Sequence, residues 1–274
     1  WHELPSLDDE IERAVCQIMT FLVENEYVAM YLPAKFLSRI DPHYSEVSLL
    51  LGTQVVDEAR HIEVYTKRAL ANGGGLQYSS SSTQWALKSL FTQENYVKAS
   101  FLLHLLGEGT FVDMLTFIGQ VAPDPVAKEI LVKTRQDEAR HVAFGVLTLE
   151  SIYKGGLTSA ELSEREDFII EATHLMHDRL LMEQVYERMG LDVDRWIEWA
   201  VHTPFMTGFR QMLFSKIVPN LKRLGLLTPR VREEFDRLGI LHFESGKDST
   251  EEAQPLPPEE LLAVMSELQA PGSD

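Results

Sequence analysis

The sequence predicts an all-α protein in which two helical hairpins, joined by a long crossover, form a four-helix bundle followed by additional C-terminal helices. Segments of roughly 30 residues carry apolar residues at helical spacing and show almost none of the alternation that is typical of strands. The turn signals are few, and they lie between these segments. A five-residue motif also occurs twice, once in each predicted hairpin.

Turn-forming residues divide the first part of the chain into four long helices. Asp41-Pro42 separates the first two, a Gly-rich and Ser-rich stretch at 72–82 separates the hairpins, and Ala122-Pro123 begins the last turn. Pro33 lies inside the first helix and is a candidate for a kink. The expected helices cover about 7–39, 43–71, 86–121 and 125–154.

A second helical block follows Gly155-Gly156. Its expected helices cover about 159–189, 192–203, 205–225 and 229–238. From Glu244 the composition shifts to Ser, Pro, Glu and Gln, which predicts a disordered tail with one short helical segment at 258–268. The predicted organisation is therefore a bundle over 1–156, a helical extension packed on it over 157–243, and an acidic tail over 244–274.

Composition excludes several classes of protein. The 274 residues carry a net charge of −17, which disfavours nucleic acid as a partner because nucleic-acid-binding proteins usually present a basic face. Cys16 is the only cysteine, so an intrachain disulfide and a site of several thiolates are both excluded. The sequence contains no run of about 18 apolar residues, so it predicts no membrane span. A cytoplasmic protein is expected.

The repeated motif points to chemistry. Asp57-Glu58-Ala59-Arg60-His61 recurs 80 residues later as Asp137-Glu138-Ala139-Arg140-His141. Positions i and i+3 share one face of a helix, so each motif presents a carboxylate and an imidazole to the same point. One such motif is ordinary on a helix surface, but two identical ones in helical context call for a common explanation.

Each motif has a glutamate upstream at nearly the same distance. Glu26 precedes Glu58 by 32 residues, and Glu108 precedes Glu138 by 30. The midpoints of both intervals are prolines in predicted turns, at positions 42 and 123. If the chain reverses there, the paired residues meet at the same height of an antiparallel hairpin. All six side chains are then expected to converge halfway along the bundle.

Four carboxylates and two imidazoles in one interior predict a dinuclear metal centre. Four buried glutamates would be costly alone, whereas two divalent cations balance their charge. Carboxylates with one imidazole per metal suit iron, with manganese or a mixed pair as alternatives. This layout is the one by which helical bundles hold two metal ions. The predicted ligands are Glu26, Glu58, His61, Glu108, Glu138 and His141.

The other charged residues of the motifs are candidates for positioning the ligands. Asp57 and Asp137 can accept the free ring N–H of a ligand histidine, and Arg60 and Arg140 can pair with these aspartates. The alternative for all four is salt bridging on a helix surface.

With these residues in view, roughly residues 10–155 resemble the ferritin-like di-iron carboxylate superfamily. The repeated motif is similar to that of bacterial multicomponent monooxygenases, the methane and toluene hydroxylases. In those enzymes the first ligand is commonly followed by tyrosine. Glu26-Tyr27 matches that pattern, which favours Glu26 over Glu24 as the ligand.

The chain also departs from its relatives within that superfamily. The hydroxylases have a threonine four residues after the third-helix glutamate, where this chain has Val112, and Thr110 is expected to point elsewhere. The resembling p-aminobenzoate N-oxygenases carry an additional histidine ligand where Thr134 stands. His104, one turn before Glu108, is either an extra ligand or a core histidine.

The resemblance implies an oxygen-activating oxidase or monooxygenase that takes electrons from a reductase or ferredoxin. Its expected partners are O2 and a small apolar, aromatic or amine substrate. Residues on the same helix faces as the ligands are expected to line the substrate pocket: Met30, Phe101, Leu105, Phe111, Val112 and Leu115. The alternative is that they are simply core residues.

Two other functions remain open from the sequence. Tyr65 has the spacing from the first ligand histidine that the radical tyrosine has in the small subunit of ribonucleotide reductase, so a radical-generating subunit is one alternative. An iron-handling or peroxide-scavenging protein is the other. The oligomeric state, a homodimer included, and the substrate are left open.

Overall fold

The computed structural model describes residues 4–78, 81–178 and 183–252. The regular structure in these ranges is entirely helical and includes no strand, so the predicted all-α class is confirmed. The elements in chain order are α1 (Asp9–Leu37), α2 (Ser45–Leu70), α3 (Ser81–Phe91), α4 (Tyr96–Ser100), the π-helix η1 (Phe101–Gly107), α5 (Glu108–Val121), α6 (Pro125–Tyr153), α7 (Ser159–Asp178), α8 (Glu183–Arg188), α9 (Val193–His202), α10 (Pro204–Met212), α11 (Ile217–Arg223), α12 (Pro229–Arg237), the 3-10 helix η3 (Leu241–Ser245) and α13 (Ser249–Glu252).

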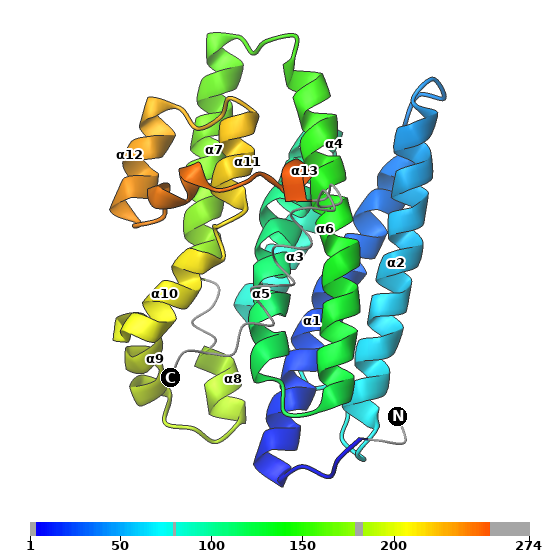
Figure 1. Ribbon diagram of the computed structural model, residues 1–274, viewed down its shortest axis with the longest axis vertical. Helices are drawn as coiled ribbons and strands as arrows, with labels where there is room; N and C mark the ends of the chain where they lie inside the picture. The colour runs from blue at the N-terminus through cyan, green and yellow to red at the C-terminus, as the bar shows by residue number, and fades with distance from the viewer. Residues whose placement is uncertain (1–3, 79–80, 179–182, 253–274) are drawn as a thin grey trace, which may run out of the picture.

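Two pairs of long helices form the centre of the molecule. α1 lies along α2, α5 lies along α6, and α2 also contacts α6 (Figure 1). Short turns join the two helices within each pair, at 38–44 and 122–124. The apolar residues of α1 recur at helical spacing and are buried between the pairs, as Val15, Met19, Leu22 and Val23 show. α1 continues through Pro33 as far as Leu37.

A buried arginine fastens one end of this arrangement. Arg68, in the last turn of α2, donates from Nε to Asp124 Oδ2 at 3.1 Å and from Nη1 to Glu12 Oε1 at 2.7 Å. Asp124 is the N-cap of α6 and accepts from the Ala127 amide at 2.7 Å, with Pro125 in the first turn. The start of α1, the end of α2 and the start of α6 are therefore held by one charged group.

The segment predicted as one helix over 86–121 differs from the prediction. α3 ends at Phe91, and a new helical run starts after Asn95, whose side chain accepts from the Lys98 amide at 3.1 Å. The polar residues 92–95 interrupt the helix because Asn95 is a strong N-cap. The run from Tyr96 to Val121 then passes through the seven residues of η1, whose wider turns rotate the preceding side chains relative to Glu108.

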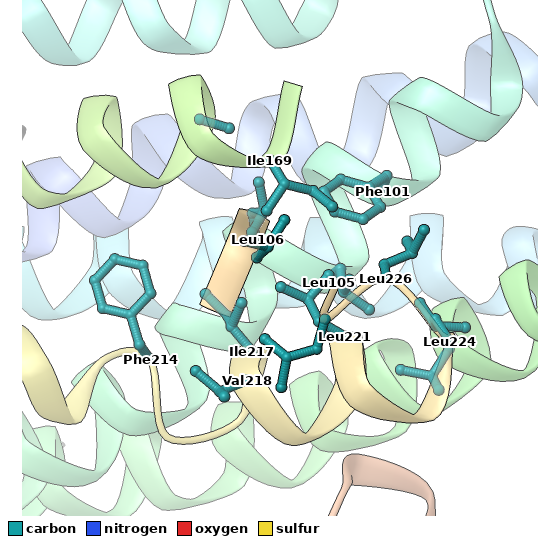
Figure 2. Close-up of a cluster of buried hydrophobic side chains, with 14 of the residues drawn as sticks. Phe101, Leu105, Leu106, Ile169, Phe214, Ile217, Val218, Leu221, Leu224 and Leu226 are labelled. Atoms are coloured by element: carbon teal, nitrogen blue, oxygen red, sulfur yellow. The ribbon is translucent and has the colours of Figure 1, made fainter. Parts of the chain in front are cut away.

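The later helices form a layer against η1 and α6. α7, α11 and α13 contact these central helices, and Figure 1 shows α7 to α12 on the side of α5 and α6 that faces away from α1 and α2. The layer is held by a large buried apolar cluster, in which Phe101 and Leu105 of η1 meet Ile169 of α7 and Ile217 and Leu221 of α11 (Figure 2).

The helix predicted over 205–225 is two helices. α10 ends at Met212 and α11 starts at Ile217. Between them the Ser215 hydroxyl donates to the Asp113 carboxylate of α5. Phe214 and Ile217 are both buried in the same apolar cluster.

The chain is still packed where the tail was expected to begin. Ser249 and Thr250 are buried, and the Asn220 side chain donates to the Ser249 hydroxyl at 2.9 Å. The segment predicted as a short helix at 258–268 lies outside the described residues.

One helical run among the described residues is long and apolar enough to cross a membrane, Tyr96–Val121. Its most apolar window is 67% buried inside the protein, and it carries the buried side chains of His104 and Glu108. Most of this apolar window therefore belongs to the core of the protein.

Candidate metal centre

Six buried acidic and imidazole side chains meet between the central helices. Each is at most 3% exposed. α1 contributes one, α2 two, the start of α5 one and α6 two: Glu26, Glu58, His61, Glu108, Glu138 and His141. The two segments that share the repeated motif therefore do face each other, as the spacing predicted.

The six side chains divide into two overlapping groups. Glu26 and His61 lie with Glu58 and Glu138 in one group, and Glu108 and His141 lie with the same two glutamates in the other. Within each group, one ligand atom from every residue lies within 4.8 Å of the others. Two neighbouring metal positions that share Glu58 and Glu138 would produce this arrangement.

Both imidazoles turn the same ring nitrogen towards the glutamates. His61 Nδ1 lies 2.9 Å from Glu58 Oε2 and 3.3 Å from Glu138 Oε1. His141 Nδ1 lies 3.2 Å from Glu58 Oε1 and 3.6 Å from Glu138 Oε2. The Nδ1 atoms are therefore the nitrogens available to a metal.

The other ring nitrogens are held by the aspartates, and each aspartate holds the histidine of the opposite motif. His61 Nε2 lies 3.2 Å from Asp137 Oδ2, and His141 Nε2 lies 3.3 Å from Asp57 Oδ2. An Nε2–H that donates to a carboxylate leaves Nδ1 with its lone pair directed at the centre.

Two arginines join these aspartates. Arg60 Nη2 donates to Asp57 Oδ1 at 2.7 Å and to Asp137 Oδ2 at 2.8 Å. Arg140 pairs with Asp137 of its own helix and lies 3.6 Å from Asp57 Oδ2. Both arginine side chains are more than half exposed, so the network caps the centre on its solvent side.

The electrostatics of the centre indicate that it favours a positive charge among the carboxylates. Burial raises the pKa of Glu26 well above the usual value, and the charges of Glu138 and Glu58 raise it further. Burial and the Glu138 charge likewise raise the pKa of Glu108. Burial lowers the pKa of His61, but the carboxylates of Glu138, Glu26 and Glu58 outweigh it and raise that pKa far above its ordinary value. Protons therefore supply positive charge that a metal ion would otherwise bring.

Several buried atoms at the centre make no hydrogen bond, although buried polar atoms are normally paired. They are Glu26 Oε1, Glu108 Oε2, both carboxylate oxygens of Glu138, and His141 Nδ1. Four carboxylates and two imidazoles form a hard donor set whose formal charge two divalent cations would cancel. The residues therefore fit a pair of metal ions.

Comparison with models of known protein families gives no match, and comparison with curated proteins gives none either. The geometry of the side chains alone carries the conclusion that this buried cluster can hold metal.

The structure reveals a supporting residue that the sequence analysis missed. Gln54 is completely buried, and its Nε2 donates to Glu108 Oε1 at 2.7 Å. Its Oε1 lies 3.1 Å from His104 Nε2, and His104 Nδ1 lies 2.9 Å from the Ser100 hydroxyl. Gln54 precedes Glu58 by one turn, so its position on the ligand face of α2 was the available signal.

His104 lies outside both ligand groups and is a hydrogen-bonded core histidine. Burial and the neighbouring His141 charge lower the pKa of His104 to about 3, so its ring is neutral. Because Gln54 Nε2 donates to a carboxylate, Gln54 Oε1 must accept from His104 Nε2–H. His104 therefore fixes the orientation of the Gln54 amide.

A small cavity of about 70 Å³ adjoins the centre. Its polar lining includes the carboxylates of Glu26, Glu108 and Glu138, and its other walls are mainly apolar. Thr110, which was expected to point elsewhere, lines this cavity, while its hydroxyl donates to the Gly107 carbonyl at 2.7 Å.

Of the predicted pocket residues, Phe111 lines the cavity and the others do not. Phe101, Leu105 and Val112 belong to the cluster beneath the C-terminal layer, Leu115 belongs to the core around α1 and α2, and Met30 is half-buried away from the cavity. For Phe101 and Leu105 the prediction assumed α-helical turns before Glu108, whereas both residues lie in η1, whose wider turns rotate them away from the ligands.

Tyr65 lies one turn after His61 and is fully buried. Burial raises the pKa of its hydroxyl well above the usual value, and the Glu26 charge raises it further. The phenol is therefore held in its neutral form beside the acidic centre.

Proposed function

We propose that this chain is a ferritin-like, dinuclear non-haem iron oxidase or oxygenase that activates O2 to oxidise a small organic substrate. The observation that carries the proposal is the pair of overlapping ligand groups, with Glu58 and Glu138 common to both, directly beside an apolar cavity. A storage site for iron would not need an apolar chamber against its ligands. An apolar, aromatic or amine substrate fits the chamber.

In this proposal Glu58 and Glu138, which belong to both ligand groups, would be shared by the two metals, while Glu26 with His61, and Glu108 with His141, would each hold one. When bound, a pair of ferrous ions would provide electrons for the reduction of O2, and an external reductase or ferredoxin in the cytoplasm would have to restore those electrons. Asp57 and Asp137 keep the histidine Nε2 atoms protonated and the rings oriented.

The walls of the chamber would confine the reaction. Phe21, Phe111 and Met114 keep water away from the open side of the glutamates. The Thr110 hydroxyl is the one hydroxyl among the described lining residues, and its oxygen can accept a hydrogen bond from a substrate or a water.

The test is oxygen uptake by the protein loaded anaerobically with two ferrous ions per chain. The proposal predicts uptake faster than that of free ferrous ion, and further acceleration by an apolar amine or aromatic substrate. Glu138→Ala should abolish it, whereas Glu129→Ala, an exposed change on the same helix, should not. Two bound irons that take up no oxygen would refute the proposal.

A radical-generating subunit is the second candidate, and the buried, protonated Tyr65 one turn from His61 favours it. Paramagnetic resonance after iron and oxygen are added separates the two. A persistent organic radical that Tyr65→Phe removes would select the radical-generating subunit, and its absence would select the oxidase or oxygenase.

A further inference from the structure

The chamber beside the glutamates adjoins a second, larger cavity. This outer cavity has a volume of about 330 Å³ and lies between α3 and α7, in contact with η1. The inner and outer cavities have four lining residues in common: Leu87, Leu90, Gly107 and Met176. Gly107 directly precedes Glu108, so the neck between the cavities lies beside a predicted ligand.

The walls of this passage are mainly apolar. Leu102, Leu106, Phe168, Ala172 and Leu175 line the outer cavity, and Trp85 stands at its exposed edge. Apolar walls give no fixed hydrogen-bonding pattern, so recognition there depends on shape and on area removed from water. A molecule that fills both the inner cavity of about 70 Å³ and the outer cavity of about 330 Å³ has to extend from one to the other, which suits a chain better than a compact ring system.

The charged residues of the two linings determine which polar head group an extended apolar ligand can carry. No lysine or arginine lines either cavity among the described residues, and the exposed Glu171 lies in the outer one. An anionic head group would therefore meet a carboxylate and no compensating cation, in a protein whose net charge is −17.

We infer that the substrate is an extended apolar molecule with an uncharged or amine head group, which enters between α3 and α7 and reaches the glutamates through the neck at Leu87, Leu90, Gly107 and Met176. This inference rests on the proposed function for its chemistry, but binding itself does not depend on turnover. α3 forms the outer wall, and Thr83 is the one buried side chain among its described residues.

The test is calorimetric binding of 1-butanol, 1-hexanol, 1-octanol, octylamine and octanoate to the iron-loaded protein without oxygen. Affinity should rise about fourfold for each methylene added to the alcohol. Octanol and octylamine should bind more tightly than octanoate. Equal or tighter binding of octanoate would overturn the inference about the head group, and affinity that is independent of chain length would overturn the inference about the passage.

Two variants locate the site. Leu87→Trp fills the neck and should weaken octanol binding about tenfold or more, whereas Gln84→Trp, an exposed change on the same helix outside both linings, should not. Glu171→Lys is exposed and leaves the core untouched, and it should strengthen octanoate binding about two- to fivefold. Unchanged affinities in both variants would refute the passage.

Iron content and oxygen uptake, measured on the same samples, keep this inference separate from the proposed function. Bound iron and normal oxygen uptake without octanol binding would refute the passage alone. Octanol binding that obeys these expectations in a protein without oxygen uptake would support the passage and refute the oxidase.

Discussion

Asp57 Oδ2 lies 3.3 Å from His141 Nε2, so the aspartate of the first motif holds the histidine of the second. The reverse pair, Asp137 and His61, lies 3.2 Å apart. The two motifs therefore form one unit in which neither histidine is oriented by its own helix alone. This cross-pairing explains why the aspartates and the arginines recur together with the ligands.

Asp57→Asn should weaken metal binding while leaving two sites that fill at high metal concentration. The amide keeps the size of the side chain but no longer provides a charged acceptor for His141 Nε2–H. Loss of such a partner typically lowers metal affinity by about 10- to 100-fold, and we expect a decrease of that size in Asp57→Asn. Competition with a chelator measures it. Glu63→Gln, an exposed change on the same helix, is the control, and equal affinities in the two variants would contradict the role of Asp57.

Gln54→Leu should weaken one of the two metal positions more than the other. Gln54 Nε2 donates to Glu108 Oε1 at 2.7 Å, and Glu108 belongs to only one ligand group. Without that donor the carboxylate loses its fixed orientation, while Glu26 and His61 are untouched. A metal titration should then separate into two steps about tenfold or more apart. A single step like that of the wild type would show that Gln54 does not position the ligand.

Metal binding should weaken as the pH falls, and binding should release protons. In the metal-free centre the pKa values of Glu26, Glu108 and His141 are all raised, so these groups keep protons to higher pH than free side chains do. Metal must displace those protons, so lower pH favours the metal-free form. Apparent affinity measured between about pH 8 and about pH 6 should decrease steadily. Affinity that is independent of pH would mean that the metal binds elsewhere.

Arg68→Met should destabilise the fold without changing the metal ligands. The side chain of Arg68 is fully buried against Asp124 and Glu12, and its removal takes from these two acids the cation that both contact. Breaking such a buried pair costs about 3–5 kcal/mol. Denaturant unfolding gives the value, and Arg237→Met, an exposed arginine on α12, should change stability by less than about 0.5 kcal/mol. A loss in Arg68→Met as small as that control would contradict the role of the buried arginine.

The sequence was most informative where two regularities reinforced each other. Helical spacing within each motif and the prolines at 42 and 123 together predicted that Glu26, Glu58, Glu108 and Glu138 would meet, and the structure brings them together. Both regularities depend only on helix geometry and chain reversal, which short-range residue patterns determine.

The cavity could not be predicted in the same way. Which face of a helix lines a chamber depends on its rotation, and η1 changes that rotation immediately before Glu108. A π-helix has no apolar period distinct enough to be recognised among the leucines of 101–107. The positions of Phe101 and Leu105, which lie within η1, were misjudged for this reason.

The ends of the shorter helices escaped prediction because tertiary contacts determine them. Ser215 bonds to Asp113 more than a hundred residues earlier, and the chain breaks between α10 and α11 at that point. No local pattern near 213–216 encodes that partner.

The central claim is that Glu58 and Glu138 are shared by two metal ions. Anomalous diffraction at the iron edge from crystals of the iron-loaded protein tests it most directly. Two peaks should lie between these carboxylates, about 3.5–4 Å apart, one on the side of Glu26 and His61 and the other on the side of Glu108 and His141. A single peak, or peaks outside these six side chains, would contradict the account.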